Sequence, residues 1–87
     1  MPKIQKELMV MSPQGLHARP AAMFVQIASK YDCSITVKKG QEKVNGKSIM
    51  GILMIGAQHH SKITVTADGK DADAALSELE EFLSKTE

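Results

Sequence analysis

Four short segments of the chain alternate apolar and polar residues, a pattern typical of β-strands that bury one face. The predicted strands lie at residues 4–11, 33–38, 42–44 and 62–67. A sheet built from them has one apolar face, and that face needs a second layer to exclude water. This requirement restricts the fold more than any other feature of the sequence.

Three helices are predicted between and after the strands, and their apolar stripes supply that second layer. The clearest stripe lies in the last helix and contains Ala72, Ala75, Leu76, Leu79, Phe82 and Leu83. Asp71 is well placed as the N-cap of this helix, with Asp73 in its first turn. The other two helices are expected from Ala18 to Lys30 and in the short segment between Ser48 and Gly56.

The expected element order is therefore β-α-β-β-α-β-α, which describes an α+β fold of the open-faced β-sandwich type. One four-stranded, mostly antiparallel sheet carries three helices on one face and meets water on the other. We expect a single domain over residues 1–87, because a chain of this length is near the small end of what folds on one core.

Charge and aromatic content exclude some classes of partner. The net charge is +1, and the chain holds one Tyr, two Phe and no Trp, so no broad nucleic-acid surface is expected. Cys33 is the only cysteine, which excludes an internal disulfide and favours a reducing cytosol. The N-terminal segment resembles no signal peptide, and no stretch reaches membrane-spanning length. We therefore expect a cytoplasmic protein without membrane insertion.

The segment G-L-H-A-R-P-A-A, residues 15–22, sets a histidine at the predicted start of the first helix. Proline disrupts a helix interior but is tolerated in the first turn, where the N–H groups have no intrahelical partner. Pro20 therefore places the helix start just before Ala18 and places His17 at or next to the N-cap. Gly15 lets the backbone turn sharply beside the imidazole.

This placement of His17 favours a phosphoryl acceptor. The free amides of Ala18 and Arg19 would face a group attached to His17, and the Arg19 guanidinium adds a bidentate phosphate ligand. The positive end of the helix disfavours imidazolium, so a neutral, nucleophilic ring is expected. The alternative interpretation of these residues is a surface histidine beside a turn, with Arg19 solvated.

Ser48 precedes the short helix, which is unusually apolar for its length. A plain N-cap is the simpler interpretation of this serine. If Ile52 and Ile55 face the core, the other apolar residues cannot all be buried with them: Ile49, Met50 and Leu53. Some of these must form an exposed patch of the kind that binds partners, and a phosphate on Ser48 would weaken docking there.

The remaining histidines, His59 and His60, are adjacent, which is a poor arrangement for chelating one metal ion. A solvated loop is the expected place for both, and nothing in the pattern assigns them a role. We therefore predict no metal site.

Together these segments resemble the HPr phosphocarrier family of the bacterial sugar phosphotransferase system (PTS). The likeness extends over essentially the whole chain. It rests on three stretches in the family's order and spacing: G-L-H-A-R-P-A (15–21), A-S-K-Y-D (28–32) and K-S-I-M-G (47–51). The resemblance implies an open-faced β-sandwich that is a phosphocarrier rather than an enzyme and needs no cofactor.

The same resemblance implies partners and site residues. Enzyme I would phosphorylate His17, which in the family carries the phosphate on Nδ1. Enzyme IIA domains would then receive the phosphoryl group. Arg19 and the Ala18 amide would bind the phosphate while His17 carries it. The family's docking surface maps onto Ala18, Ala22, Gln26, Ile49, Met50 and Leu53. Ser48 matches the serine that an ATP-dependent HPr kinase/phosphorylase modifies in many bacteria, where a transcriptional regulator is a further partner. We expect a monomer.

Two other interpretations stay open. One is the nitrogen-regulatory branch of the same family, although K-S-I-M-G favours the sugar branch. The other is a non-catalytic regulatory module that binds proteins through the Ile49–Met50 patch and uses Ser48 as its only switch.

Overall fold

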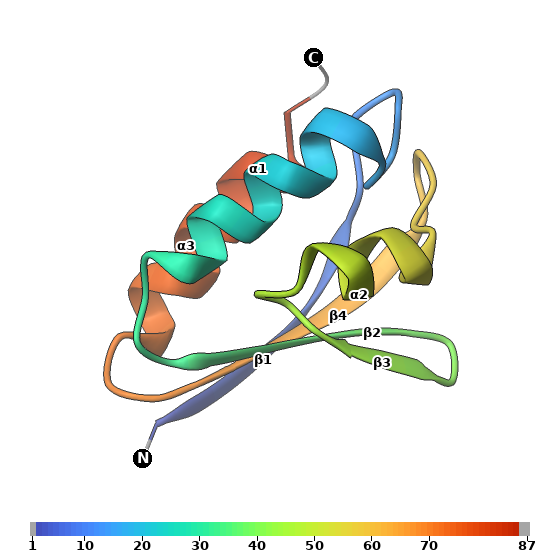
Figure 1. Cartoon of the computed structure of the whole chain (residues 1–87). Helices are drawn as coiled ribbons and strands as arrows, with labels where there is room; N and C mark the ends of the chain where they lie inside the picture. The colour runs from blue at the N-terminus through green and yellow to red at the C-terminus, as the bar shows by residue number, and fades with distance from the viewer. Residues whose placement is uncertain (1, 86–87) are drawn as a thin grey trace.

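The computed structural model of the chain describes residues 2–85, and its elements follow the predicted order. The strands are β1 (Lys3–Met9), β2 (Ser34–Lys39), β3 (Glu42–Asn45) and β4 (Lys62–Asp68). The helices are α1 (Ala18–Ser29), α2 (Ile49–Ile55) and α3 (Ala72–Leu83). Figure 1 shows all the helices of this part of the chain on one side of the sheet, with α1 and α3 side by side. The predicted open-faced β-sandwich is confirmed.

The strands form one sheet in the order β1-β4-β2-β3, and every pairing between them is antiparallel. Strand β4 lies between β1 and β2, so that Ile63 stands opposite Leu8 and Val65 opposite Val37. These four side chains are buried against the helices. The opposite face is polar, where Thr66 Oγ1 donates a hydrogen bond to Gln5 Oε1. The period-two alternation of the sequence therefore separates a covered face from an open one.

Strand β1 ends two residues earlier than predicted, at Met9 rather than Met11. Val10 is still fully buried, but it bonds to a loop instead of the strand ladder. Its N–H donates to the Ser61 carbonyl at 2.9 Å, and its carbonyl accepts from the His60 N–H at 2.6 Å. These two bonds hold the loop between α2 and β4 against the segment that follows β1.

The core lies between the sheet and the helices. The stripe of α3 is buried as predicted at Ala72, Ala75, Leu76, Leu79 and Leu83, while Phe82 is partly exposed. Phe24, on α1, is the largest of the fully buried side chains. No helix within residues 2–85 combines the length and the apolar character needed to cross a membrane.

The prediction that the Asp71 side chain caps α3 is wrong. Asp71 occupies the N-cap position, but its carboxylate makes no hydrogen bond to its own helix. Instead it accepts from the N–H of Asp32 at 2.8 Å and from the N–H of Cys33 at 2.9 Å. These hydrogen bonds hold the pKa of Asp71 below its ordinary value, and the bond from the Asp32 N–H has the largest effect. The carboxylate thus fastens the start of α3 to the loop before β2.

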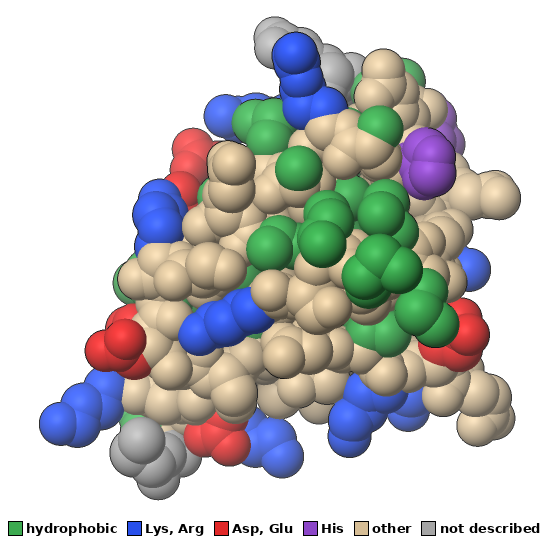
Figure 2. Space-filling view, viewed as in Figure 1, with side chains coloured by type: hydrophobic (Ala, Val, Ile, Leu, Met, Phe, Trp, Pro, Cys, Tyr) green, Lys and Arg blue, Asp and Glu red, His purple; other side chains and the backbone are tan. Residues whose placement is uncertain are grey.

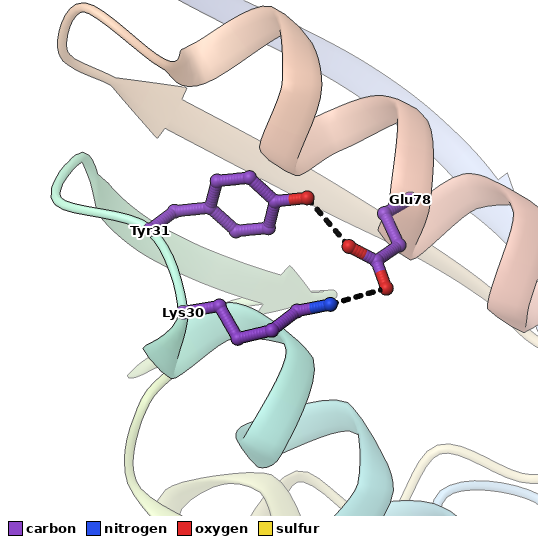
Figure 3. A network of polar contacts seen from close by, with 3 residues as sticks. All are labelled: Lys30, Tyr31 and Glu78. Atoms are coloured by element: carbon purple, nitrogen blue, oxygen red, sulfur yellow. Dashed lines mark hydrogen bonds and ion pairs between the residues drawn. The ribbon is translucent and has the colours of Figure 1, made fainter.

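A polar contact joins the end of α1 to the middle of α3 (Figure 3). The Lys30 ammonium lies 2.7 Å from one carboxylate oxygen of Glu78, and the Tyr31 hydroxyl donates to the other. The hydrogen bond from Lys30 is the main cause that lowers the pKa of Glu78, and the bond from Tyr31 lowers it further. The bond to that carboxylate is also the main cause that raises the pKa of Tyr31. The C-terminal end of α1 is therefore anchored to α3, and His17 lies at the opposite end of α1.

Candidate functional site

His17 is the N-cap residue of α1, as predicted from Pro20 and Gly15. Its backbone is extended, with φ −137° and ψ 154°, and its side chain makes no capping hydrogen bond to the helix. The residue is exposed to solvent. An imidazole in this position is open to a partner and is not engaged by its own helix.

The next residue, Ala18, has φ +50°, a left-handed conformation that non-glycine residues adopt with strain. The N–H groups of Ala18 and Arg19 have no hydrogen-bond partner among residues 2–85. The predicted free amides are therefore present beside His17. No sequence signal indicated the positive φ, because alanine ordinarily marks regular helix.

The segment before His17 is fixed by a close contact with the loop between α2 and β4, which lies beside it in Figure 1. The Leu16 N–H donates to the Ala57 carbonyl at 2.7 Å, and the Leu16 side chain is buried. Gly15 has φ +68°, and a Cβ added there would lie 2.5 Å from the Ala57 carbonyl oxygen. Glycine is therefore required by both the conformation and the close approach.

Two surface hollows flank His17 and Arg19. His17 lines one of them together with Pro13, Gln14, Leu16, Gly56, Ala57, Gln58 and His59. Arg19 lines the other together with Ser12, Pro13, Gln14, Pro20, Met23, Phe82 and Lys85. The hollows share Pro13 and Gln14. His17 and His59 therefore line one hollow, while Arg19, the predicted phosphate ligand, lines the other together with Lys85.

Ser48 is the N-cap of α2, and its hydroxyl oxygen accepts from the Gly51 N–H at 3.1 Å. The residue is half-buried. Its neighbour Lys47 reaches back across the chain and donates from Nζ to the carbonyl oxygen of Tyr31. The capping role of Ser48 is confirmed, and its hydroxyl sits at the edge of the exposed surface of α2.

Helix α2 buries Ile52 and Ile55 and leaves its other large apolar side chains in contact with solvent, as predicted. We call the following residues the apolar patch: Ile49 (39% exposed), Met50 (64% exposed), Met54 (70% exposed) and the half-buried Leu53. Figure 2 shows apolar side chains gathered on this face of the molecule, beside a histidine. Ala22 and Gln26 are exposed on α1, which packs against α2.

Met54 was not among the residues predicted for the patch, yet it is the most exposed large apolar side chain of the described residues. Its signal was available, because Met54 follows Met50 by four residues and therefore shares its helix face. No role was predicted for His59, since no local pattern connects residue 59 with residue 17.

The adjacent histidines are exposed in a loop, as predicted, and their rings stack with centroids 3.7 Å apart. His60 has φ +71°, which turns the chain back toward Val10. Within residues 2–85 no three His, Cys, Asp or Glu side chains are arranged to hold a metal ion.

Comparisons with known proteins agree with this geometry. The family model for the PTS HPr component phosphorylation site matches residues 4–85. The phosphocarrier protein HPr from Bacillus anthracis is 41% identical, with a TM-score of 0.92 over 94% of this chain and 98% of that chain. HPr from Thermoanaerobacter tengcongensis is 40% identical, with a TM-score of 0.81 over 100% of both chains.

A further structural relative is Crh, the Bacillus subtilis catabolite repression HPr, which is 34% identical. Its TM-score is 0.72, and the match covers 97% of this chain and 100% of that one. The exposed histidine at the start of α1, the fold and the family model all lead to one assignment: the chain belongs to the HPr family of PTS phosphocarrier proteins.

Proposed function

We propose that the chain accepts a phosphoryl group on His17 from phosphorylated enzyme I and passes it to enzyme IIA domains. The observation that carries this proposal is the exposed, unengaged imidazole at the N-cap of α1. A lone pair on a ring nitrogen, Nδ1 by likeness to the family, forms the new P–N bond as the donor's bond to phosphorus breaks. The donor keeps the electrons of the broken bond. On delivery, an acceptor group of enzyme IIA forms the new bond to phosphorus, and His17 keeps the electrons of the P–N bond that breaks.

The start of α1 supports this chemistry electrostatically. The unpaired N–H groups of Ala18 and Arg19 give the helix N-terminus a positive end that suits phosphoryl oxygens. We propose that the Arg19 guanidinium turns toward His17 when the group arrives, which its exposed side chain permits. The chain itself has no substrate pocket in this proposal, and the partner completes the transfer site.

Docking is proposed on the surface formed by α1 and α2. Ala18, Ala22 and Gln26 contribute the exposed side of α1, and the apolar patch contributes α2. Methionine side chains suit a surface that must fit several partners in turn, because the thioether is flexible and polarisable. His17 is the N-cap of α1, and α1 packs against α2, so docking on the patch would bring a partner close to the acceptor.

Ser48 is proposed as a regulatory phosphorylation site for an ATP-dependent kinase/phosphorylase. A phosphate would add about two negative charges next to Ile49 and Met50 and weaken docking on the patch. The start of α2 tolerates that charge, so the fold would survive. In a host with this kinase, we propose that a transcriptional regulator binds the chain when Ser48 is phosphorylated. Labelling by host extract with ATP, compared with Ser48→Ala, tests this assignment.

Incubation with purified enzyme I and phosphoenolpyruvate tests the main proposal. The native chain should take up acid-labile, base-stable phosphate, and His17→Ala should take up none. A His59→Ala/His60→Ala double variant is the matched control, because the chain has three histidines and only His17 should be labelled. If the native chain stays unlabelled, the carrier proposal is wrong.

The likeness to Crh and the position of Ser48 beside the apolar patch favour a second candidate, a regulatory module that docks through the patch. Its signature in the same experiments is ATP-dependent labelling of Ser48 with no labelling of His17. We also propose that the chain is a monomer, which sedimentation at the concentrations used for labelling will test.

A further inference from the structure

The hollow beside His17 contains a second imidazole, that of His59. The hollow is built where the segment before α1 meets the loop between α2 and β4. Its polar side chains are those of Gln14, Gln58, His17 and His59, each of which can donate a hydrogen bond to a phosphate oxygen. No acidic residue lines it among residues 2–85. The hollow therefore suits an anion on His17.

The loop that carries His59 is held at both ends. The Leu16 N–H binds the Ala57 carbonyl at 2.7 Å, and the His60 N–H binds the Val10 carbonyl at 2.6 Å. The His60 ring stacks on the His59 ring with centroids 3.7 Å apart, yet only His59 lines the hollow. Of the two adjacent histidines, His59 therefore lines the same hollow as His17, and His60 does not.

The other cations near His17 belong to the neighbouring hollow. Arg19 and Lys85 line that one, on the far side of Pro13 and Gln14. In the described part of the chain, the titratable residues that line the hollow of His17 are His17 and His59 themselves, and the His60 ring stacks on that of His59. Among the residues that line this hollow, His59 can therefore add positive charge to that of Arg19, which in the proposed function reaches the phosphoryl group from the neighbouring hollow.

We propose that His59, as imidazolium, faces the phosphoryl group on His17 and stabilises the phosphorylated carrier at mildly acidic pH. This inference rests on the proposed function, because it concerns the phosphorylated form of His17. Only a protonated imidazole carries the charge that attracts the phosphoryl group, so the test compares mildly acidic with alkaline solution, at about pH 6 and about pH 8.5. The phosphoryl dianion and a surface imidazolium attract each other with the modest strength of an exposed ion pair.

A competition between two carriers measures the effect. Phosphorylated native chain is mixed with an equal amount of unphosphorylated His59→Gln, and a trace of enzyme I moves the phosphoryl group between them until equilibrium. Intact mass separates the two phosphorylated forms. We expect the native chain to hold about threefold more phosphate at about pH 6 and an equal share at about pH 8.5. Equal shares at both pH values would overturn the proposal.

Two variants separate charge in the hollow from structural effects of the loop. His59→Lys keeps a cation at both pH values, so it should hold more phosphate than the native chain at about pH 8.5. His60→Asn changes the stacked imidazole outside the hollow and keeps a residue type that tolerates positive φ, so it should share phosphate equally with the native chain. A loss with His60→Asn as large as that with His59→Gln would contradict the assignment to His59.

A second measurement distinguishes failure of this inference from failure of the proposed function. Phosphoramidate phosphorylates imidazole without enzyme I: its P–N bond breaks, a P–N bond to the ring forms, and ammonia leaves with the ring proton. Because the reagent reaches every exposed imidazole, the species phosphorylated on His17 alone is isolated by ion exchange and identified by peptide mapping, and ³¹P NMR then follows the second ionisation of its phosphoryl group. We expect that ionisation at lower pH in the native chain than in His59→Gln. Equal titrations overturn the inference even if enzyme I labels His17, and different titrations support it even if enzyme I does not.

Discussion

Replacement of Gly15 by alanine should destabilise the protein more than the same replacement at Gly40, the matched control. Both glycines are left-handed, with φ +68° at Gly15 and φ +61° at Gly40. The conformational penalty for alanine is therefore similar at the two positions, about 1–2 kcal/mol. The effect of the added Cβ on the unfolded chain is also common to both variants.

The two positions differ in the space around the added Cβ. At Gly15 it would lie 2.5 Å from the Ala57 carbonyl oxygen and 2.9 Å from the Cα of Gln58, whereas at Gly40 no atom lies within 4 Å. Ala57 and Gln58 present backbone atoms, so the whole loop must shift, at a cost of about 1–3 kcal/mol. Gly15→Ala should therefore lose roughly 2–5 kcal/mol of unfolding free energy, against roughly 1–2 kcal/mol for Gly40→Ala.

Urea denaturation followed by far-ultraviolet circular dichroism gives both free energies, with the slopes checked for equality. The difference between the variants, about 1–3 kcal/mol, measures the contact alone. Because Ala57 and Gln58 also line the hollow of His17, Gly15→Ala should slow labelling by enzyme I while Gly40→Ala should not. Equal losses of stability, within about 0.5 kcal/mol, would refute the argument that close approach to the loop requires Gly15.

Three further outcomes are expected. Tyr31 is the only tyrosine of the chain, so the phenolate absorbance reports it alone; it should titrate above its ordinary pKa of 10.0 and move back toward that value in Glu78→Gln. A native titration at the ordinary value would contradict the bond to Glu78. Ser48→Ala removes the oxygen that caps α2 and should lower the unfolding free energy by about 1 kcal/mol. Ser48→Asp should lower the unfolding free energy by less, because a carboxylate oxygen can also accept the capping hydrogen bond. Since folding lowers the pKa of Asp71 below 3.8, its carboxylate stabilises the fold above that pH and stops doing so as the pH falls through the folded-state pKa. The stability advantage over Asp71→Asn should therefore be present at neutral pH and shrink below about pH 4, and a gap that persists in acid would exclude the carboxylate as its cause.

Local patterns were sufficient to predict most of the secondary structure. Alternation with period two marked the strands, and the stripe from Ala72 to Leu83 marked α3, because burial on one face repeats with the geometry of each element. Pro20 and Gly15 placed His17 at the N-cap for the same local reason. The patch on α2 followed from counting, since a two-turn helix cannot bury every apolar residue it carries.

Features that depend on long-range contacts were not predictable in this way. Asp71 has the sequence context of a side-chain cap, yet its carboxylate binds the amides of Asp32 and Cys33, which no local pattern placed nearby. The positive φ of Ala18 likewise has no local signal, because alanine itself favours the right-handed region.

The sequence by itself determined the elements, their order, the position of His17 at the start of α1 and the family resemblance, because each depends on residues close together in the chain. Only the tertiary structure decided the strand order and the surroundings of His17. Folding brings the loop of residues 57–61 against residues 10–16, which places His59 in the hollow of His17 and leaves Arg19 in the next one. The physical reason is that loop positions depend on backbone hydrogen bonds and close packing between segments distant in the chain. The periodicity of apolar residues along the chain does not predict those contacts.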